Sequence, residues 1–316
     1  MERKGIAVAG VILVDKINSI SAYPECGQLT QIKNVSVAVG GCVPNVAIDL
    51  KKLSPELEVG AIGKVGKDSE GQYAVNVLKE NGVNVDEVVC CSEKTSFTEV
   101  MSVEGGQRTF FTYAGCNATF GENDIDFDNL DAKMLHLGYF LLMDKVDNGD
   151  GVKILKRAKE LGIKTSIDLV SENSDRYSLV LPCLKYTDNL IINEIEAGML
   201  TGIKATDDNL VKIAKILKEY GVTERVIIHT PTVNVCVSNA GQTVVPSYKL
   251  PQGFIKGTTG AGDAFCAGAL YSIYNGKSDE EILKIACLSA VSSLTSQDAI
   301  SGVKKVEELF ELQKQL

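Results

Sequence analysis

The residues whose types and spacing point most directly to chemistry are residues 257–268, with the sequence GTTGAGDAFCAG. The small residues at 260–262 can adopt backbone angles closed to larger residues, and they leave their amides exposed. The apolar and small residues that follow, up to Tyr274, predict a helix whose first turn has unpaired N–H groups. These amides and the positive end of the helix favour binding of an anion, above all a phosphate.

A carboxylate in a phosphate-binding turn needs a reason, because it repels the phosphate. Asp263 is either a helix cap, a position that favours Asp, or a general base for an attacking hydroxyl. Local chemistry alone leaves the two roles about even. In the second case the acceptor is a neutral alcohol, and the reaction is phosphoryl transfer from a nucleotide, with charge stabilised by the amides of Gly260, Ala261 and Gly262.

Such a transfer needs Mg²⁺ to neutralise the polyphosphate, and Mg²⁺ usually binds through one or two carboxylates with several waters. Glu196 is the candidate ligand, with Asn193 beside it, directly after a short apolar strand at residues 190–192. The alternative is that these two residues only form a polar helix start. Without further context the sequence favours this alternative.

Composition limits the class of protein. The chain has 316 residues, of which 45% are hydrophobic and 23% charged, as in ordinary globular proteins. A formal net charge of −9 argues against nucleic-acid or membrane binding, which needs a basic face. The nine cysteines have no paired metal-ligand spacing, so we expect no zinc site. Reduced core thiols and the lack of a signal-peptide pattern predict a cytoplasmic protein.

Strands and helices are expected to alternate along most of the chain. We predict strands at residues 5–14, 59–65, 134–137, 164–169, 190–192, 225–229 and 233–237. Helices are predicted at 46–53, after a cap at 68 or 69, at 149–161, from a cap at Thr206 to Gly221, after Gly260, after a capping box at Ser278 and Glu281, and at 306–312. This alternation indicates one α/β domain with a mostly parallel, helix-covered sheet.

Two β-rich stretches do not fit the alternation. Residues 29–32 and 35–39 have strand-like patterns, and residues 95–103 and 109–113 read as a hairpin joined around 104–107. They predict a small antiparallel layer beside the main sheet. Asp15, Asn45, Asn193 and the 257–263 turn all follow strands or β-segments, so they could meet at the edge of the sheet where ligands gather.

The 257–263 segment closely resembles the C-terminal signature of the ribokinase/phosphofructokinase-B (PfkB) family of carbohydrate kinases. Residues 40–47, GGCVPNVA, resemble its sugar-binding signature, and Asn193-x-x-Glu196 resembles its magnesium motif. Residues 63–71, with Gly63, Gly66, Asp68 and Gly71, also resemble the sequence pattern of the family. The order and spacing of these motifs agree along essentially the whole chain.

The resemblance implies a ribokinase-like α/β fold over residues 1–316, with a β-sheet lid formed by about residues 12–39 and 95–115. It implies an ATP-dependent kinase that phosphorylates a hydroxymethyl group of a small sugar, with Asp263 as base. The implied sites are Gly260, Ala261 and Gly262 for the anion hole, Asp15, Gly40, Gly41, Asn45 and Asn117 for the acceptor, Asn193, Thr230, Thr232, Thr259 and Gly262 for the nucleotide, and Glu196 with Asn193 for Mg²⁺.

Three positions depart from the pattern. Gly257 stands where the family usually has an Asp that helps to bind a monovalent cation, so dependence on potassium is left open. Pro231 lacks an N–H donor, so Thr230 or Thr232 would have to supply the phosphate contact. Cys42 follows Gly41 where ribokinases proper carry Lys, which argues against ribose itself.

Alternatives differ in acceptor and in class. A nucleoside kinase would need an aromatic slot, which Phe97, Phe111 and Tyr113 could form. A ribokinase-fold binding or regulatory protein with weak catalysis is the non-enzymatic alternative. A dehydrogenase is disfavoured, because residues 9–13 lack the G-x-G-x-x-G fingerprint. Exposed edges of the β layer make a homodimer through the lid plausible.

Overall fold

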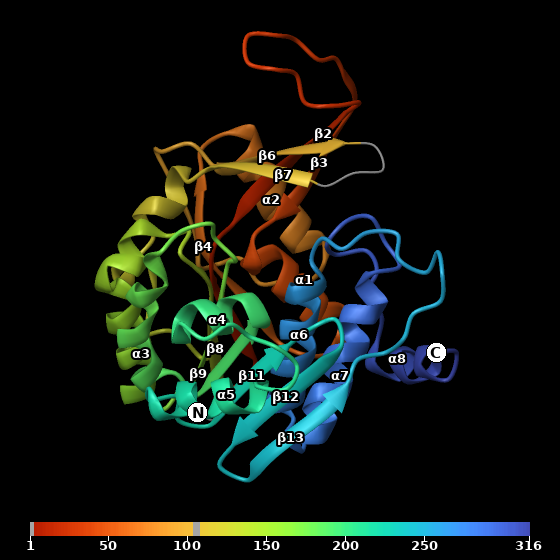
Figure 1. The fold of residues 1–316 in the computed structure, drawn as a ribbon. Coiled ribbons are helices and arrows are strands. Elements are labelled where there is room, and N and C mark those ends of the chain that lie inside the picture. Colours follow the sequence, from red (N-terminus) through yellow and green to blue (C-terminus); the bar gives the residue numbers. More distant parts are fainter. Residues whose placement is uncertain (1–2, 104–107) are drawn as a thin grey trace.

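The computed structural model describes residues 3–103 and 108–316. Among these residues, nine strands form the central sheet, in the order β13-β12-β11-β10-β9-β8-β1-β4-β5 (Figure 1). The pairings are parallel except for those that β12 makes with β11 and with β13. The strands are β1 (Ile6–Gly10), β4 (Val59–Gly66), β5 (Val88–Cys91), β8 (Met134–Phe140), β9 (Lys164–Leu169), β10 (Asn189–Asn193), β11 (Arg225–His229), β12 (Val233–Ser238) and β13 (Gly241–Pro246). The predicted mostly parallel sheet is confirmed.

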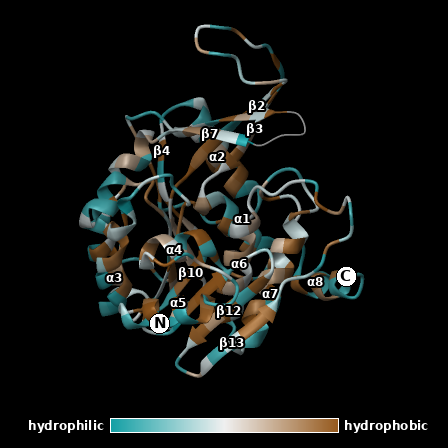
Figure 2. Ribbon diagram, viewed as in Figure 1, coloured by the Kyte–Doolittle hydropathy of each residue, from teal (hydrophilic) through white to brown (hydrophobic). Residues whose placement is uncertain are grey.

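Helices cover both faces of this sheet. Successive side chains of its strands point to opposite faces, and so they pack into two separate hydrophobic clusters. In β1, Ile6 and Val8 join one hydrophobic cluster, whereas Ala7 and Ala9 join the other. The first cluster contains residues of α1 (Cys42–Leu53), α2 (Ser69–Glu80), α6 (Ala261–Tyr274), α7 (Asp279–Ser293) and α8 (Val306–Gln313), and the second residues of α3 (Gly151–Glu160), α4 (Glu194–Thr201) and α5 (Leu210–Glu219). Figure 2 shows the hydrophobic colour concentrated on the central strands.

A smaller sheet lies at the top of the view in Figure 1, with strand order β3-β2-β6-β7. Its strands are β2 (Leu13–Ile20), β3 (Ile32–Gly40), β6 (Ser96–Val103) and β7 (Arg108–Tyr113). β2 pairs antiparallel with β3 but parallel with β6, so the prediction of an all-antiparallel layer was wrong in that pairing. β6 and β7 pair antiparallel as predicted, and their turn at 104–107 lies outside the described residues.

Other differences from the predicted elements have local causes. The strand predicted at 5–14 is two strands in two sheets, because the chain turns at Gly10, where φ is 133°. Residues 29–31 lie outside β3. Thr206 does not cap α5; Asn209 is the N-cap, and its side chain accepts a hydrogen bond from the Thr206 N–H. The sequence patterns did not reveal β5 or β13, which lie at the two edges of the sheet, and they indicated only the start of α4, at Asn193 and Glu196.

Candidate active site

The turn before α6 is shaped by a glycine in a left-handed conformation. Gly260 has φ 79°, and a Cβ there would lie 2.6 Å from the Cα of Ala299. Both the angle and the close contact require glycine. No side chain caps the first turn of α6, and its Ala261 N–H makes a long hydrogen bond, of 3.4 Å, to the carbonyl oxygen of Thr258. Such a helix start can bind an anion, and the role that the small residues indicate stays a prediction.

Asp263 lies in that first turn, but it does not act as the helix cap, since Gly260 is the N-cap residue. Its Oδ2 accepts hydrogen bonds from Nδ2 of Asn45 and from the hydroxyl of Tyr139, both at 2.9 Å. Burial, together with the negative charge of Asp168, raises the pKa of Asp263 to about 7, although the two hydrogen bonds act to lower it. Asp263 is therefore a buried carboxylate that can exchange a proton near neutral pH.

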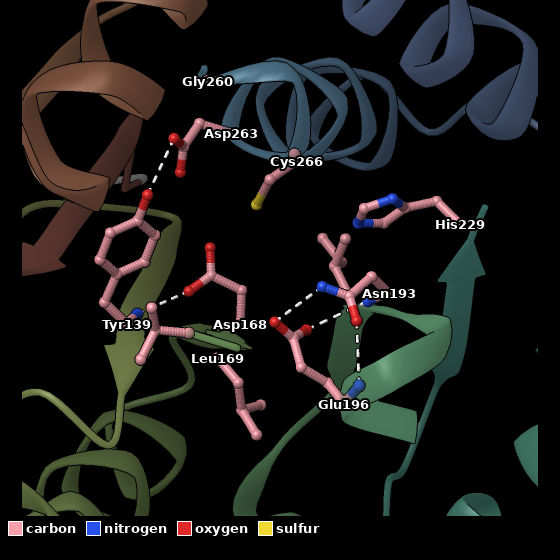
Figure 3. A pocket seen from close by; sticks show the side chains of 12 residues that line it. Tyr139, Asp168, Leu169, Asn193, Glu196, His229, Gly260, Asp263 and Cys266 are labelled. Carbon is pink, nitrogen blue, oxygen red and sulfur yellow. Dashed lines mark hydrogen bonds between the residues drawn. The ribbon is translucent and has the colours of Figure 1, made fainter. Parts of the chain in front are cut away.

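Two cavities meet at Asp263. A cavity of about 180 Å³ contains Asp168, Asn193, Glu196 and Gly262 in its lining, at the carboxyl ends of β8 to β11. Figure 3 shows Asp263 and Glu196 at opposite sides of it, with Asp168 between them. A larger cavity, of about 1290 Å³, lies beside the smaller sheet. Tyr139, Val170, Gly260 and Asp263 line both.

Glu196 and Asn193 form a capping box at the start of α4, as the alternative of a polar helix start predicts. The Glu196 carboxylate also accepts a 2.8 Å hydrogen bond from Ser171 and a 2.9 Å bond from Nδ2 of Asn193. Burial raises the pKa of Glu196 to about 8. A buried carboxylate with neutral donors around it, facing a cavity lined by amide and carboxylate oxygens, fits the oxygen ligands that Mg²⁺ prefers.

Three predicted acceptor residues line the larger cavity: Asp15, Gly41 and Asn45. Asn45 is 4% exposed, and its Oδ1 has no hydrogen-bond partner, so an acceptor is available for a ligand hydroxyl. Gly41 has φ 90°, and a Cβ there would lie 2.5 Å from the carbonyl oxygen of Val11. At Gly40 a Cβ would lie 2.3 Å from Oδ2 of Asp15, so a larger residue there would displace the Asp15 side chain, whereas the backbone itself requires glycine at position 41.

Five other predicted residues line neither cavity: Gly40, Ala261, Asn117, Thr230 and Thr232. Asn117 is buried, and its amide donates to the carbonyl of Ile12 and accepts from the Ile12 N–H. In this structure its side chain holds the Ile12 backbone and does not line a cavity. The Thr230 hydroxyl accepts from the N–H groups of Thr232 and Val233, and the Thr232 hydroxyl donates to Asp207. These local bonds occupy the hydroxyls that were expected to contact the nucleotide.

The cavity lining also contains residues that the sequence did not single out. Tyr139 combines a positive φ of 61° with a hydrogen bond from its N–H to Oδ1 of Asp168, at 2.6 Å. Asp168 lies near the end of the buried strand β9, and no sequence motif marks it. Arg108, at the start of β7, hydrogen-bonds the hydroxyl of Thr259, and both line the larger cavity. The smaller sheet thus contacts the turn before α6.

Position 257 does not fit the cation-binding carboxylate that is usual there. A Cβ at Gly257 would lie 2.7 Å from the carbonyl oxygen of Ser296 and 2.9 Å from the Cα of Gln297. Backbone fills the space that a side chain would need. Similarly, Gly260 packs on Ala299, so the 296–299 segment supports the turn directly.

Comparison with known proteins identifies this arrangement. The model of the pfkB family carbohydrate kinases matches residues 8–306. The chain belongs to this family. A ribokinase from Haemophilus influenzae is 25% identical over 98% of both chains, and fructokinase-1 from Oryza sativa is 26% identical over 96% of this chain and 95% of its own.

Among solved structures, a putative ribokinase II from E. coli, in complex with ATP and Mg²⁺, superposes with a TM-score of 0.82 at 20% identity. The match covers 99% of this chain and 100% of that one. The ribokinase-like fold, with a helix-flanked sheet and a smaller sheet, is confirmed. This pfkB protein is accordingly a carbohydrate kinase by family. No helix among its described residues is long and apolar enough to cross a membrane.

Proposed function

We propose that this kinase transfers the γ-phosphoryl group of ATP to a hydroxymethyl group of a small sugar or sugar derivative. The observation that carries the proposal is the position of Asp263, a buried carboxylate at the junction of two cavities and beside the uncapped amides of α6. Its raised pKa suits a general base near neutral pH.

In this proposal the acceptor occupies the larger cavity. Asp15 and the unpaired Oδ1 of Asn45 accept hydrogen bonds from its hydroxyls, while Asp263 removes the proton of the attacking hydroxyl. The N–H groups of residues 260–262 stabilise the charge on the transferred group. Tyr139 and Asn45 hold the carboxylate of Asp263 in place through their hydrogen bonds.

The polyphosphate would extend into the smaller cavity, with Thr259 and Gly262 near its reacting end and Asn193 farther along. The E. coli relative binds ATP and Mg²⁺, which supports the same nucleotide here. Glu196 with Asn193 would hold Mg²⁺, which neutralises phosphate charge when bound. Residues 230–234 depart from the pattern of the family, and we propose no phosphate contact for Thr230 or Thr232.

The smaller sheet would act as the lid, with boundaries near residues 12–39 and 95–115. The hydrogen bond from Arg108 to Thr259 already joins it to the turn before α6. Closure over the acceptor would exclude water, which otherwise competes for the phosphoryl group. The exposed side chains of Val35, Val37 and Phe111 make this sheet a candidate dimer surface. The nine free thiols fit a cytoplasmic location.

A panel of acceptors, assayed for ATP consumption, tests the proposed function. We expect turnover with a small sugar or sugar acid rather than a nucleoside, because the predicted aromatic slot does not line the cavity. Phe97 and Tyr113 instead pack on each other, with ring centroids 5.2 Å apart. Turnover confined to nucleosides would support the alternative acceptor. Ligand binding with no turnover on any member would support a regulatory protein and contradict the kinase proposal.

Activity should depend on pH through Asp263. A base acts only when deprotonated, and burial raises the pKa of this carboxyl to about 7, so kcat/KM should fall as pH decreases through about 7. Burial also raises the pKa of Asp15, to about 6, which should steepen the loss on the acid side. Steady-state kinetics between about pH 5.5 and 9 would measure this. A flat profile across that range would contradict the assignment.

Potassium should have little effect on turnover. The Ser296 and Gln297 backbone occupies the space of the usual carboxylate at position 257, and Ala299 supports Gly260 directly. We therefore expect similar kcat values in potassium, sodium and tetramethylammonium chloride at equal ionic strength. Activation of tenfold or more by potassium alone, equal to about 1.4 kcal/mol in the barrier, would show that the segment still binds a cation.

A further inference from the structure

A buried histidine, aspartate and cysteine converge beside the candidate active site. His136 lies on β8, Asp168 on β9 and Cys266 on α6, and one ligand atom from each lies within 4.8 Å of the others. Nε2 of His136 is 3.3 Å from Oδ2 of Asp168 and 3.6 Å from Sγ of Cys266. His136 lies 32 positions before Asp168 and 130 before Cys266 in the sequence, although the three are neighbours in space. The spacing of the cysteines therefore could not reveal this cluster.

The two separations from Nε2 of His136 are those expected between ligands around one tetrahedral zinc ion. Zn–N and Zn–O bonds of about 2.0–2.1 Å and a Zn–S bond of about 2.3 Å place neighbouring ligand atoms about 3.3–3.6 Å apart. The other ring nitrogen of His136, Nδ1, is hydrogen-bonded to the Ser166 hydroxyl at 3.0 Å, and this bond orients the imidazole. A hydrogen bond of this kind fixes the ring of a metal-binding histidine.

The fourth position faces the smaller cavity. Asp168 and Cys266 line that cavity, and Figure 3 shows both side chains directed into it between Asp263 and Glu196. Oδ1 of Asp168 is held by the Tyr139 N–H, whereas Oδ2 contacts Nε2 of His136, a contact that a bound cation would replace. Three protein ligands and one open position form the pattern of accessible zinc sites.

We propose that His136, Asp168 and Cys266 bind a borderline-soft divalent cation of the zinc class, separate from the Mg²⁺ expected at Glu196. A thiolate and an imidazole favour zinc or cobalt over magnesium, which prefers oxygen ligands. Binding releases the thiol proton. The thiol is protonated in the metal-free protein, because burial holds the pKa of Cys266 well above its ordinary value.

Cobalt titration of the whole protein tests the site, because Co²⁺ bound to thiolate has a charge-transfer band that Mg²⁺ does not produce. Cys26, Cys90 and Cys91, which have exposed surface, are first replaced by Ser to remove other thiols. In this background, with excess Mg²⁺, we expect one equivalent of Co²⁺ to give the band and Zn²⁺ to abolish it. Cys266→Ser should eliminate the band, and Cys287→Ser, at another buried cysteine, should retain it.

Persistence of the band in Cys266→Ser, or its absence from the background protein, would overturn the proposal. Displacement of Co²⁺ by Mg²⁺ at similar concentration would do the same, since it would indicate an oxygen site. X-ray absorption of the zinc-loaded background protein gives a measurement that needs no core substitution. One sulfur among the zinc ligands, with an imidazole, is expected; no sulfur, or several, would contradict the site.

Discussion

Replacement of Asp263 by Asn should lower kcat by roughly 10²–10⁴-fold, the usual contribution of a positioned general base. The amide oxygen can still accept the hydrogen bonds from Asn45 and Tyr139, so the cavity should keep its shape. Nucleotide affinity should therefore change little, and the loss should appear in kcat rather than in KM. Steady-state kinetics together with calorimetric ATP binding would measure both.

Asp49→Asn is a matched control for this substitution. Asp49 is a fully buried carboxylate on α1 with no hydrogen-bond partner, and burial raises its pKa well above the ordinary value. It lines neither cavity. We expect almost unchanged turnover in this variant. Equal losses in both variants would mean that kcat responds to replacement of any buried carboxyl group, and an unaffected Asp263→Asn enzyme would remove Asp263 from the mechanism.

Gly260→Ala should have the second largest effect. A Cβ at this position would lie 2.6 Å from the Cα of Ala299, so the turn must move and carry its amides with it. A displacement of about 1 Å at a reacting group can cost about 100-fold in rate. We expect kcat to fall by about that factor, with a lower melting temperature, because alanine at positive φ costs roughly 1–2 kcal/mol.

The opposite end of the same helix supplies the control. Gly276 follows α6 with φ 67°, and a Cβ there would meet no atom within 4 Å. Gly276→Ala therefore introduces the backbone strain without the collision. We expect it to destabilise the fold to a comparable degree while turnover stays near that of the unmodified enzyme. Similar kinetic losses in both variants would show that strain, rather than displaced amides, accounts for the effect.

Local chemistry in the sequence was enough to predict the glycine turn and the polar helix start, whereas the roles of Asp263 and Glu196 came from the resemblance to the family and stay predictions. A glycine turn followed by a small-residue helix has few other structures available, and Glu196 after Asn193 is a capping pattern recognisable from spacing. For the same reason the alternation of strands and helices predicted the layers of the fold. The residues after these strands were expected to lie together at one edge of the sheet, because parallel strands place their carboxyl ends together.

Contacts that depend on long-range packing could not be predicted from the sequence. Tyr139 contacts Asp263 only because a positive φ turns the chain at the end of β8, and no residue pattern marks that angle for a tyrosine. Asn117 lies in a family-like position, yet its amide binds the backbone of Ile12, 105 residues earlier. The hydroxyls of Thr230 and Thr232 are occupied by neighbours whose geometry only the folded turn defines.

The passage from β1 to β2 affects how the smaller sheet can move. Val11 and Ile12, which join the two sheets, are almost completely buried, and Asn117 binds both polar groups of the Ile12 backbone. A segment held in this way cannot swivel as a loose linker does. Any outward motion of the sheet must bend strands β2 and β3 along their length. We therefore expect the smaller sheet to open by bending rather than by rotation about a hinge at Val11 and Ile12.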